Sequence, residues 1–436
     1  NNGNNNNNGN GNNGPNYMEN ILLTGTVTGH VYFWLNQRVK TTLTAHDAPI
    51  YTICELNHYS GGKFATGGKD GLVKIWSETL QLLHTYNLQT FSPSPYGLSC
   101  HSLIANQVSS KLAIGLRSGE VYEVTLGTNS SIVLLESHSY RQLHGLCMNP
   151  INVDEYVTVG DDGVVRVWSL TQRRCLRRST IEVAGRSVSW SPDGNHIAIG
   201  IGGDPTMNTK DGAIMILSSQ SLDVIFEDRK AKFTISDIKY SPSGRLLAVA
   251  SRDGKVYFHD CSPENISQQY KLLTILPLGL KESYVTHIDF NNESTIIKFS
   301  TSGCELLHYS LNEYPYNNIQ LIPLASTIRD EVWSTNNVPY GWLVKGVWKP
   351  PNENIEVCAL DTTIFSLATK RGLIAAAYSD GEIKIFNYPC QNIGTEHHQL
   401  EGVATYVPTL KFSLDGNYLL ALDAATRSII QYKLIK

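Results

Sequence analysis

The chain has 436 residues, of which 41% are hydrophobic and 17% are charged, and its formal net charge is −4. This composition is sufficient for a large buried core, and the slight negative charge excludes a global attraction to nucleic acid or to an anionic membrane surface. No apolar stretch approaches the roughly 18 residues of a membrane-spanning helix, and the first residues lack the pattern of a secretory signal. We therefore expect a soluble cytoplasmic protein without nucleic-acid or membrane partners.

The N-terminal segment is of low complexity. Its first sixteen residues are eleven Asn, four Gly and one Pro, with neither a charge nor an apolar side chain. Such a segment cannot bury apolar surface, and its Gly and Pro residues interrupt any strand. The sequence therefore predicts a disordered leader over residues 1–17.

After this leader, a β-hairpin signature recurs nine times along the chain. The clearest copies are FATGGKDGLVKIW (64–76), YVTVGDDGVVRVW (156–168), LAVASRDGKVYFH (247–259) and IAAAYSDGEIKIF (374–386). Asp-Gly between alternating apolar runs predicts a hairpin with a type I′ turn, in which both central residues have φ > 0. Weaker copies contain Gly29, Gly119, Gly212 and Gly303, and the ninth copy, near Arg427, has lost its glycine.

The spacing of these hairpins predicts the architecture. Six of the seven intervals between successive turn glycines are 42–49 residues long, and a second hairpin signal such as YSPSGRLLAVA (240–250) precedes several of them. Two hairpins per unit make four strands, and four-stranded units at this period are typical of WD-type propeller blades. We therefore expect an all-β protein, a WD-repeat β-propeller with about nine four-stranded units. The remaining interval, of 78 residues, indicates an insertion at about 306–356.

Two of the units contain a matching set of polar residues. The sets are His46, Thr66, Asp70 and Trp76 in the second unit, and His138, Thr158, Asp162 and Trp168 in the fourth. We expect the carboxylate to accept a hydrogen bond from the imidazole, the imidazole to donate onward to the hydroxyl, and the hydroxyl to reach the indole N–H. His, Thr and Asp together also fit a nucleophilic triad. Because the set repeats with the unit, whereas an active site occurs once, we interpret it as structural and predict no catalytic residue.

Other candidates for chemistry are few. The eight cysteines lie far apart without a Cys-x-x-Cys pair, which indicates reduced core residues rather than disulfides or a metal site. No lysine-bearing phosphate loop, metalloprotease motif or nucleophile elbow occurs, so we expect no enzyme, cofactor, metal or small-molecule substrate. The densest cationic cluster is Arg173, Arg174, Arg177 and Arg178. It fits contact with an acidic partner or, alternatively, an exposed edge strand that the arginines keep soluble.

Several segments are distinctive beyond the regular repeat. They are ILLTGTVTGHVYFW (21–34), LHGLCMNP (143–150), TIRDEVW (327–333), GWLVKGVW (341–348), SDGEIKIFNYPC (379–390) and SIIQYKLIK (428–436). Together they resemble the C-terminal WD-repeat region of the echinoderm microtubule-associated protein-like family, and the resemblance extends from residue 18 to the end of the chain. The two segments at 327–348 are similar to an insertion of that family, which accounts for the interval of 78 residues.

The resemblance implies a domain organisation and a function. Residues 18–135 would be three blades from the end of a first propeller, and residues 136–436 would be the second propeller. The chain would bind tubulin or microtubules and organise the microtubule cytoskeleton without catalysis. It departs from the family's pattern in lacking a coiled coil and a basic leader, and Ala424 and Ala425 replace the turn residues of the last blade. The alternative function is a general WD-repeat scaffold of a cytosolic assembly unrelated to microtubules.

The number of blades raises a question of closure. Nine units exceed the four to eight blades typical of one ring, and three left-over blades do not close a ring of their own. We therefore expect either a piece of a longer protein or a single irregular ring in which the early blades join the later ones.

Overall fold

The computed structural model describes residues 21–56, 62–92, 96–106, 111–203, 210–262, 269–279, 282–311, 316, 318–349, 355–366, 371–403 and 406–435. Within these ranges the chain consists mainly of β-strands, and its helical elements are the short 3₁₀ segments η1 (Leu88–Thr90), η4 (Ala325–Ile328) and η5 (Trp342–Val347). The all-β prediction is confirmed. The leader predicted for residues 1–17 lies outside the described residues. None of the described helical segments has the length and apolarity to cross a membrane.

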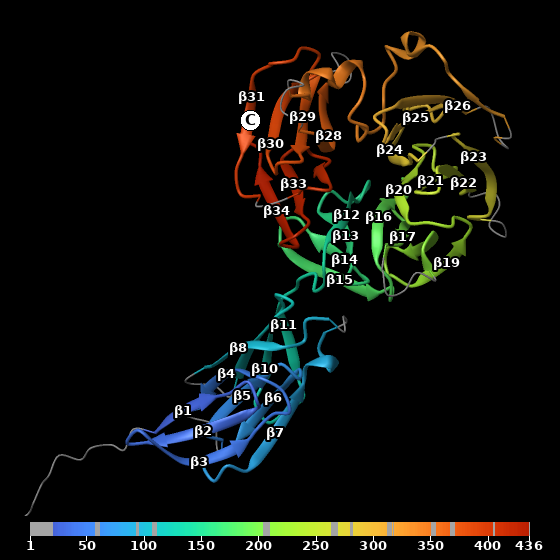
Figure 1. Cartoon of the computed structure of the whole chain (residues 1–436). Helices are drawn as coiled ribbons and strands as arrows, with labels where there is room; N and C mark the ends of the chain where they lie inside the picture. Colours follow the sequence, from blue (N-terminus) through green and yellow to red (C-terminus); the bar gives the residue numbers. More distant parts are fainter. Residues whose placement is uncertain are drawn as a thin grey trace, which may run out of the picture. The chain divides into compact units, whose positions relative to one another are not determined.

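The described strands form nine antiparallel sheets, which belong to two compact units (Figure 1). The N-terminal unit contains residues 1–92 and 98–134, and the C-terminal unit contains residues 93–97 and 135–436. Three sheets belong to the N-terminal unit: β1 (Leu22–Gly25), β2 (His30–Leu35) and β3 (Arg38–Thr44); β4 (Ile50–Glu55), β5 (Phe64–Gly68), β6 (Leu72–Trp76) and β7 (Leu82–Asn87); and β8 (Cys100–Ala105), β9 (Lys111–Leu116), β10 (Val121–Thr125) and β11 (Ser131–Leu135).

The C-terminal unit contains the other six described sheets, and in each of them the strands pair in chain order. The first three are β12 (Leu143–Met148), β13 (Glu155–Gly160), β14 (Val164–Ser169) and β15 (Arg174–Thr180); β16 (Gly185–Trp190), β17 (His196–Ile201), β18 (Ala213–Ser218) and β19 (Val224–Arg229); and β20 (Ile235–Tyr240), β21 (Leu246–Ser251), β22 (Lys255–Asp260) and β23 (Leu272–Pro277). The last three are β24 (Val285–Phe290), β25 (Ile296–Thr301), β26 (Leu306–Leu311) and β27 (Ile319–Leu321); β28 (Val357–Ser366), β29 (Arg371–Tyr378), β30 (Ile383–Tyr388) and β31 (His397–Leu400); and β32 (Leu410–Phe412), β33 (Tyr418–Asp423) and β34 (Ser428–Lys433).

These six sheets close into a ring, with the first strand of each sheet nearest the centre (Figure 1). Strand β16 lies beside β12 and β20, and β32 lies beside β28 and β12. At the junction of the last and first sheets, the Leu143 N–H donates to the Ala424 carbonyl at 3.3 Å and the Thr409 hydroxyl donates to the His144 carbonyl at 2.9 Å. The predicted β-propeller is therefore confirmed, because a closed ring of radial antiparallel sheets defines that fold. Five of the six described sheets have four strands, and the last has three.

A segment of the predicted insertion lies between the sheet of β24 and the sheet of β28. We call residues 332–338 the bridging segment. The backbone N–H groups of Asn337 and Val338 donate to the Asp289 carboxylate on β24 at 2.9 and 2.8 Å. On the other side, the Asn336 amide donates to the Thr362 hydroxyl of β28 at 3.0 Å. The bridging segment thus joins two neighbouring sheets of the ring through backbone and side-chain hydrogen bonds.

The hairpin turns differ from the predicted type I′. Gly163 has φ of 65° and its N–H donates to the Gly160 carbonyl, but Asp162 does not have a positive φ. One left-handed glycine at the end of a four-residue turn corresponds to a type I turn followed by a bulge, so the predicted turn type is wrong. The physical reason is that the Asp162 carboxylate accepts the N–H of Val164, two residues ahead, at 3.3 Å. In the hairpin at 302–304 the left-handed residue is Cys304, with φ of 61°.

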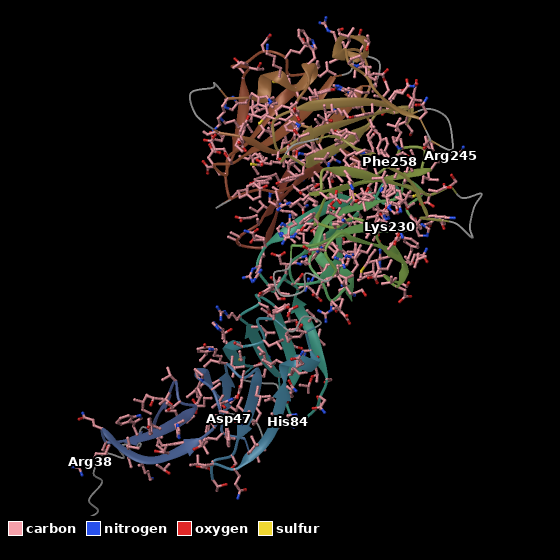
Figure 2. The ribbon with its side chains drawn as sticks, turned by 45° about the vertical axis from the view of Figure 1, so that its right-hand side comes forward. Arg38, Asp47, His84, Lys230, Arg245 and Phe258 are labelled. Atoms are coloured by element: carbon pink, nitrogen blue, oxygen red, sulfur yellow. The ribbon has the colours of Figure 1, made fainter. Side chains whose placement is uncertain are left out.

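The core consists of apolar side chains packed between neighbouring sheets, and Figure 2 labels one of them, Phe258. Phe258 on β22, for example, is fully buried and belongs to one cluster with Phe290 on β24 and Phe299 on β25. Burial of each such ring stabilises the fold by roughly 1.5–3 kcal/mol relative to an exposed ring. Inter-sheet packing of this kind holds the innermost strands in position around the centre of the ring.

Candidate functional site

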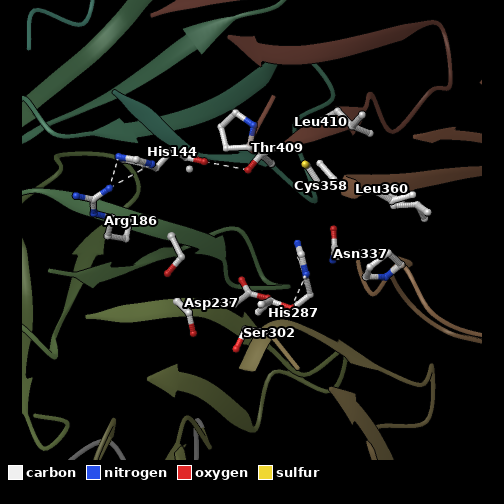
Figure 3. A pocket seen from close by; sticks show the side chains of 18 of the residues that line it. His144, Arg186, Asp237, His287, Ser302, Asn337, Cys358, Leu360, Thr409 and Leu410 are labelled. Atoms are coloured by element: carbon white, nitrogen blue, oxygen red, sulfur yellow. Dashed lines mark hydrogen bonds between the residues drawn. The ribbon is translucent and has the colours of Figure 1, made fainter. Parts of the chain in front are cut away.

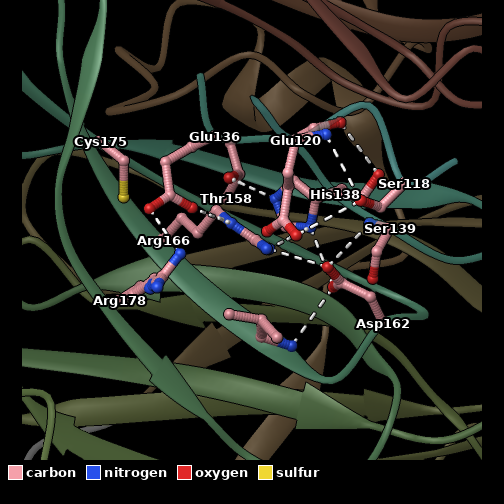
Figure 4. Close-up of polar contacts among 12 residues, drawn as sticks. Ser118, Glu120, Glu136, His138, Ser139, Thr158, Asp162, Arg166, Cys175 and Arg178 are labelled. Carbon is pink, nitrogen blue, oxygen red and sulfur yellow. Dashed lines mark hydrogen bonds and ion pairs between the residues drawn. The ribbon is translucent and has the colours of Figure 1, made fainter. Parts of the chain in front are cut away.

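The network around His138 joins the first two strand pairs of the sheet β12–β15 (Figure 4). His138 Nδ1 lies 2.9 Å from Asp162 Oδ1, and its Nε2 lies 2.8 Å from Thr158 Oγ1. The indole N–H of Trp168 donates to the same threonine oxygen at 2.8 Å. All four side chains are buried. The structure thus brings together the four residues that the sequence predicts to form a network in this unit.

The direction of these hydrogen bonds differs from the expected one. Burial lowers the pKa of His138, although the neighbouring Asp162 opposes this shift. Burial alone would raise the pKa of Asp162, but His138 and Arg166 outweigh it and hold that pKa below its ordinary value. A neutral imidazole has a single N–H, which Nδ1 uses to donate to the carboxylate. Its Nε2 therefore accepts a hydrogen bond from the Thr158 hydroxyl, rather than donating to it.

The N-terminal unit contains the second network, in the sheet β4–β7. His46 Nδ1 lies 2.8 Å from Asp70 Oδ2, and His46 Nε2 lies 2.8 Å from Thr66 Oγ1. The Trp76 indole donates to Thr66 at 2.9 Å. The same geometry in two sheets favours a role in holding the strands in register, because every hydrogen-bonding atom of the threonine and histidine is used internally.

Two features of these networks were not singled out from the sequence. The guanidinium of Arg166, fully buried on β14, donates to Asp162 at 2.8 Å, and Lys74 at the same position of the other network donates to the Ala45 carbonyl at 2.7 Å. In the sequence, Arg166 and Lys74 could have been found as the basic residue that lies two places before the tryptophan of each network. In addition, the Trp34 indole donates to the Thr24 hydroxyl at 2.8 Å, with the same ten-residue spacing as in the complete networks.

The arginine cluster lies at the outer edge of the sheet β12–β15, on β15 and in the turn before it. Arg177 and Arg178 are half-buried and form ion pairs of 2.8 and 2.6 Å with glutamates of the same unit. Arg173 and Arg174 are exposed, and Arg173 has φ of 54° in the turn. Two of the four guanidinium groups are therefore engaged in the fold, and two face solvent.

The innermost strands of the C-terminal unit line a central cavity of about 610 Å³ (Figure 3). In each of the first five of these strands the register shifts at the second residue. These five residues all line the cavity; they are His144, Arg186, Ser236, Thr286 and Cys358. Because a bulge turns the extra side chain out of the regular alternation, it directs a residue of the inner strand toward the axis. The recurrent bulge therefore explains why the cavity is lined by polar side chains.

One wall of the cavity is held by a compact charged group (Figure 3). Arg186 pairs with Asp161 at 3.0 Å and donates to the carbonyls of Gly202 and Gly203 at 2.7 and 2.9 Å. His144 also contacts Asp161 at 3.1 Å, and burial lowers the pKa of this histidine. Burial likewise lowers the pKa of His287 on another wall. Both imidazoles are therefore neutral near pH 7, so the positive charge of the cavity comes from arginine and lysine.

The residues of this ring match a known family. A family model described as the echinoderm microtubule-associated protein second β-propeller matches residues 143–434, and a WD domain G-β repeat model matches residues 37–77. The first match covers about two thirds of the chain. The chain belongs to this family. The resemblance seen in the sequence is therefore confirmed, and the six sheets of the ring lie within the matched residues.

Curated relatives extend the similarity to the N-terminal unit. The chain is 24% identical to echinoderm microtubule-associated protein-like 2 of Homo sapiens over 419 residues, which are 95% of this chain and 59% of that protein. It is 25% identical to the 77 kDa echinoderm microtubule-associated protein of Strongylocentrotus purpuratus, over 95% of this chain and 56% of that protein. It is 24% identical to echinoderm microtubule-associated protein-like 4 of Mus musculus, over 93% of this chain and 37% of that protein. The chain thus spans about three fifths or less of these relatives.

Proposed function

We propose that this chain is a non-enzymatic WD-repeat protein that binds tubulin or microtubules and helps to organise the microtubule cytoskeleton in the cytoplasm. The observation that carries the proposal is the match of the whole ring to the second propeller of a family whose members are named as microtubule-associated. The match concerns a shared domain and does not name the partner of this chain. That this partner is tubulin is therefore our proposal.

The blade networks support a role without catalysis. His138 is the one imidazole in its network, and it is held between Asp162 and Thr158 with both ring nitrogens in hydrogen bonds. A general base needs a nitrogen that can reach a substrate proton. Because neither nitrogen is free for a substrate, this His, Thr and Asp set stabilises the sheet. We also propose that residues 18–135 represent the end of a first propeller and residues 136–436 the second.

The exposed part of the arginine cluster is the proposed contact with tubulin. Arg173 and Arg174 face solvent at the edge of the ring, while Arg177 and Arg178 are held by ion pairs. Exposed guanidinium groups at an interface rim accelerate association with an acidic surface and make binding sensitive to salt. We therefore expect Arg173 and Arg174 to make most of the contact between this cluster and tubulin.

Co-sedimentation with stabilised microtubules and gel filtration with unpolymerised tubulin, both over a salt series, test this proposal. The double variant Arg173→Glu and Arg174→Glu is expected to bind several-fold more weakly and with a shallower salt dependence. The matched control is Arg38→Glu with Lys40→Glu, which reverses two exposed charges on β3 of the N-terminal unit. If both double variants lose binding equally, the contact is not specific to Arg173 and Arg174. A folded chain that binds neither form of tubulin would instead favour a general scaffold.

A further inference from the structure

The central cavity of the C-terminal unit contains cations that the described fold does not use. Its volume of about 610 Å³ lies within the roughly 300–1,000 Å³ typical of ligand pockets. Four basic side chains line it: Arg186, Lys239, Arg252 and Lys411. Arg186 is paired with Asp161, and Lys411 is paired with Asp361 at 2.8 Å. These two therefore hold the walls of the cavity together.

The other two cations have no such partner. Within the described part of the chain, neither the Lys239 ammonium nor the Arg252 guanidinium forms a hydrogen bond or an ion pair; Arg252 lies over the Tyr284 ring, 4.9 Å from its centroid. Ser187 also lines the cavity, and its hydroxyl is buried without a hydrogen-bond partner among the described residues. Buried polar groups are nearly always satisfied, so an unpartnered hydroxyl in the same lining as two unpaired cations indicates that a ligand completes the site.

The distribution of these groups defines the charge of the ligand. Lys239 lies at the fifth position of β20, within the cavity, whereas Arg252 is exposed in the turn between β21 and β22. A carboxylate entering from the exposed turn would meet Arg252 first and Lys239 deeper in the cavity.

The cavity lining also contains carboxylates and aromatic rings. Asp237 and the exposed Glu356 line it, the Tyr284 ring lies against Arg252, and Tyr340 and Tyr406 provide further aromatic surface. A dense polyanion would be repelled by Asp237 and Glu356, whereas a peptide can place acidic side chains beside the cations and neutral residues beside these two carboxylates. Aromatic rings are also suited to contact an extended peptide backbone.

We propose that the central cavity of the C-terminal unit binds acidic side chains presented by an extended peptide, with Arg252 at the mouth and Lys239 deeper in the cavity as their ligands. Arg186 and His144 act as positioning residues, because their own hydrogen bonds fix the wall beside the site. This proposal does not rest on tubulin binding: the peptide site is defined by the cavity, and the tubulin contact is defined by Arg173 and Arg174 at the outer edge.

Fluorescence anisotropy of the full chain at low ionic strength tests the proposal. The probe is a labelled Gly/Ser peptide with a central Glu-Glu pair, and the matched probe carries Gln-Gln. The acidic peptide is expected to bind at least about tenfold more tightly, since hydrogen bonds to charged groups are the strong ones. Unlabelled tripolyphosphate added as a competitor distinguishes an acidic side chain from a free phosphate. Equal binding of the two peptides would overturn the proposal.

Variants of the lining residues sharpen the test. Arg252→Ala and Lys239→Met are each expected to weaken the acidic peptide about tenfold, with Arg252→Lys retaining part of the affinity. Glu356→Gln is expected to strengthen binding, because it removes a repulsive carboxylate. The control Arg38→Ala removes an equal charge from the N-terminal unit and should change nothing.

Two results would contradict the assignment. Native affinity in both Arg252→Ala and Lys239→Met would exclude these side chains as ligands, and Arg252 is exposed, so its loss leaves the fold intact. Tripolyphosphate that displaces the peptide at lower concentration than the unlabelled peptide itself would assign the cavity to free phosphate instead. Neither result depends on whether the chain binds tubulin.

Discussion

Thr158 occupies the centre of the His138 network, because its hydroxyl donates to the imidazole and accepts from the Trp168 indole. Substitution of Thr158 by Val keeps the shape of the side chain but leaves a buried indole N–H and a buried imidazole nitrogen without partners. Each unsatisfied buried group costs about 1–3 kcal/mol, so the free energy of unfolding is expected to fall by about 2–6 kcal/mol. Urea unfolding followed by tryptophan fluorescence measures this change.

The control for this experiment is Thr41→Val on the exposed strand β3, where a change within about 0.5 kcal/mol is expected. A Thr158→Val variant as stable as the native chain would show that the network contributes nothing to stability, and the structural interpretation of the histidine set would then fail.

Buried neutral histidines predict how stability depends on pH. Burial and, to a smaller extent, the nearby Lys298 lower the pKa of His308 to about 4. The unfolded chain binds a proton at this imidazole near its ordinary pKa of about 6.5, but the folded chain does not. The free energy of unfolding therefore decreases as pH falls below about 6.5, by up to about 1.4 kcal/mol per pH unit for this one group. The histidines with lowered pKa that add to this effect are His138, His144, His259 and His287.

Urea unfolding at a series of pH values from 7 to 5 measures this effect. The variant His308→Phe is expected to reduce the slope of the free energy of unfolding against pH, because one proton fewer is taken up on unfolding. Stability that is constant or rises as the pH falls over this range would show that these histidines are protonated in the folded chain.

At the residue scale, the sequence was sufficient to find the network members but not their protonation. The positions of His138, Thr158, Asp162 and Trp168 repeat with the unit, so spacing alone identified them. The direction of the hydrogen bonds depends on burial of the imidazole and on Arg166, which lies on the neighbouring strand β14. Such neighbours come together only in the folded sheet, and a single sequence does not display them.

At the element scale, the bridging segment depends on one carboxylate. Asp289 is fully buried and accepts the Asn337 and Val338 N–H groups, while Lys298 lies 3.4 Å away. Substitution of Asp289 by Ala removes these bonds and leaves the lysine without its counter-charge. Breaking a buried charged pair costs about 3–5 kcal/mol, so we expect a loss of this size in the free energy of unfolding.

Denaturant unfolding of Asp289→Ala measures this loss, and Glu293→Ala, an exposed carboxylate in the turn after β24, is the matched control. If both variants were equally stable, the bridging segment would not depend on Asp289, and the ring would be held together at this point by other contacts.

The hairpins could be predicted at this scale, whereas the bulges could not. Asp-Gly pairs and their spacing depend on local backbone preference, and they located most turns correctly. The register shift at residues such as Arg186 is a property of the pairing of β16 with β17, and the residues of the strand do not display it. The cavity lining was therefore invisible until the sheets were placed around the ring.

At the scale of the whole molecule, the fold class and the family could be predicted because both depend on repeated local patterns and on distinctive segments. The charged residues that remain available to a partner could not be predicted. Arg177 and Arg178 looked equivalent to Arg173 and Arg174, yet they pair with Glu155 and Glu136, which lie more than twenty residues earlier in the chain. Long-range ion pairs of this kind decide which part of a basic cluster remains exposed.

The most direct test of the central claim is binding of the full chain to unpolymerised tubulin, measured by sedimentation velocity at low and at moderate ionic strength. We expect a complex that sediments faster than either component and that weakens as salt increases. Independent sedimentation of the two proteins at low ionic strength, with a chain that is folded and monodisperse, would contradict the proposal that this propeller is a tubulin-binding module.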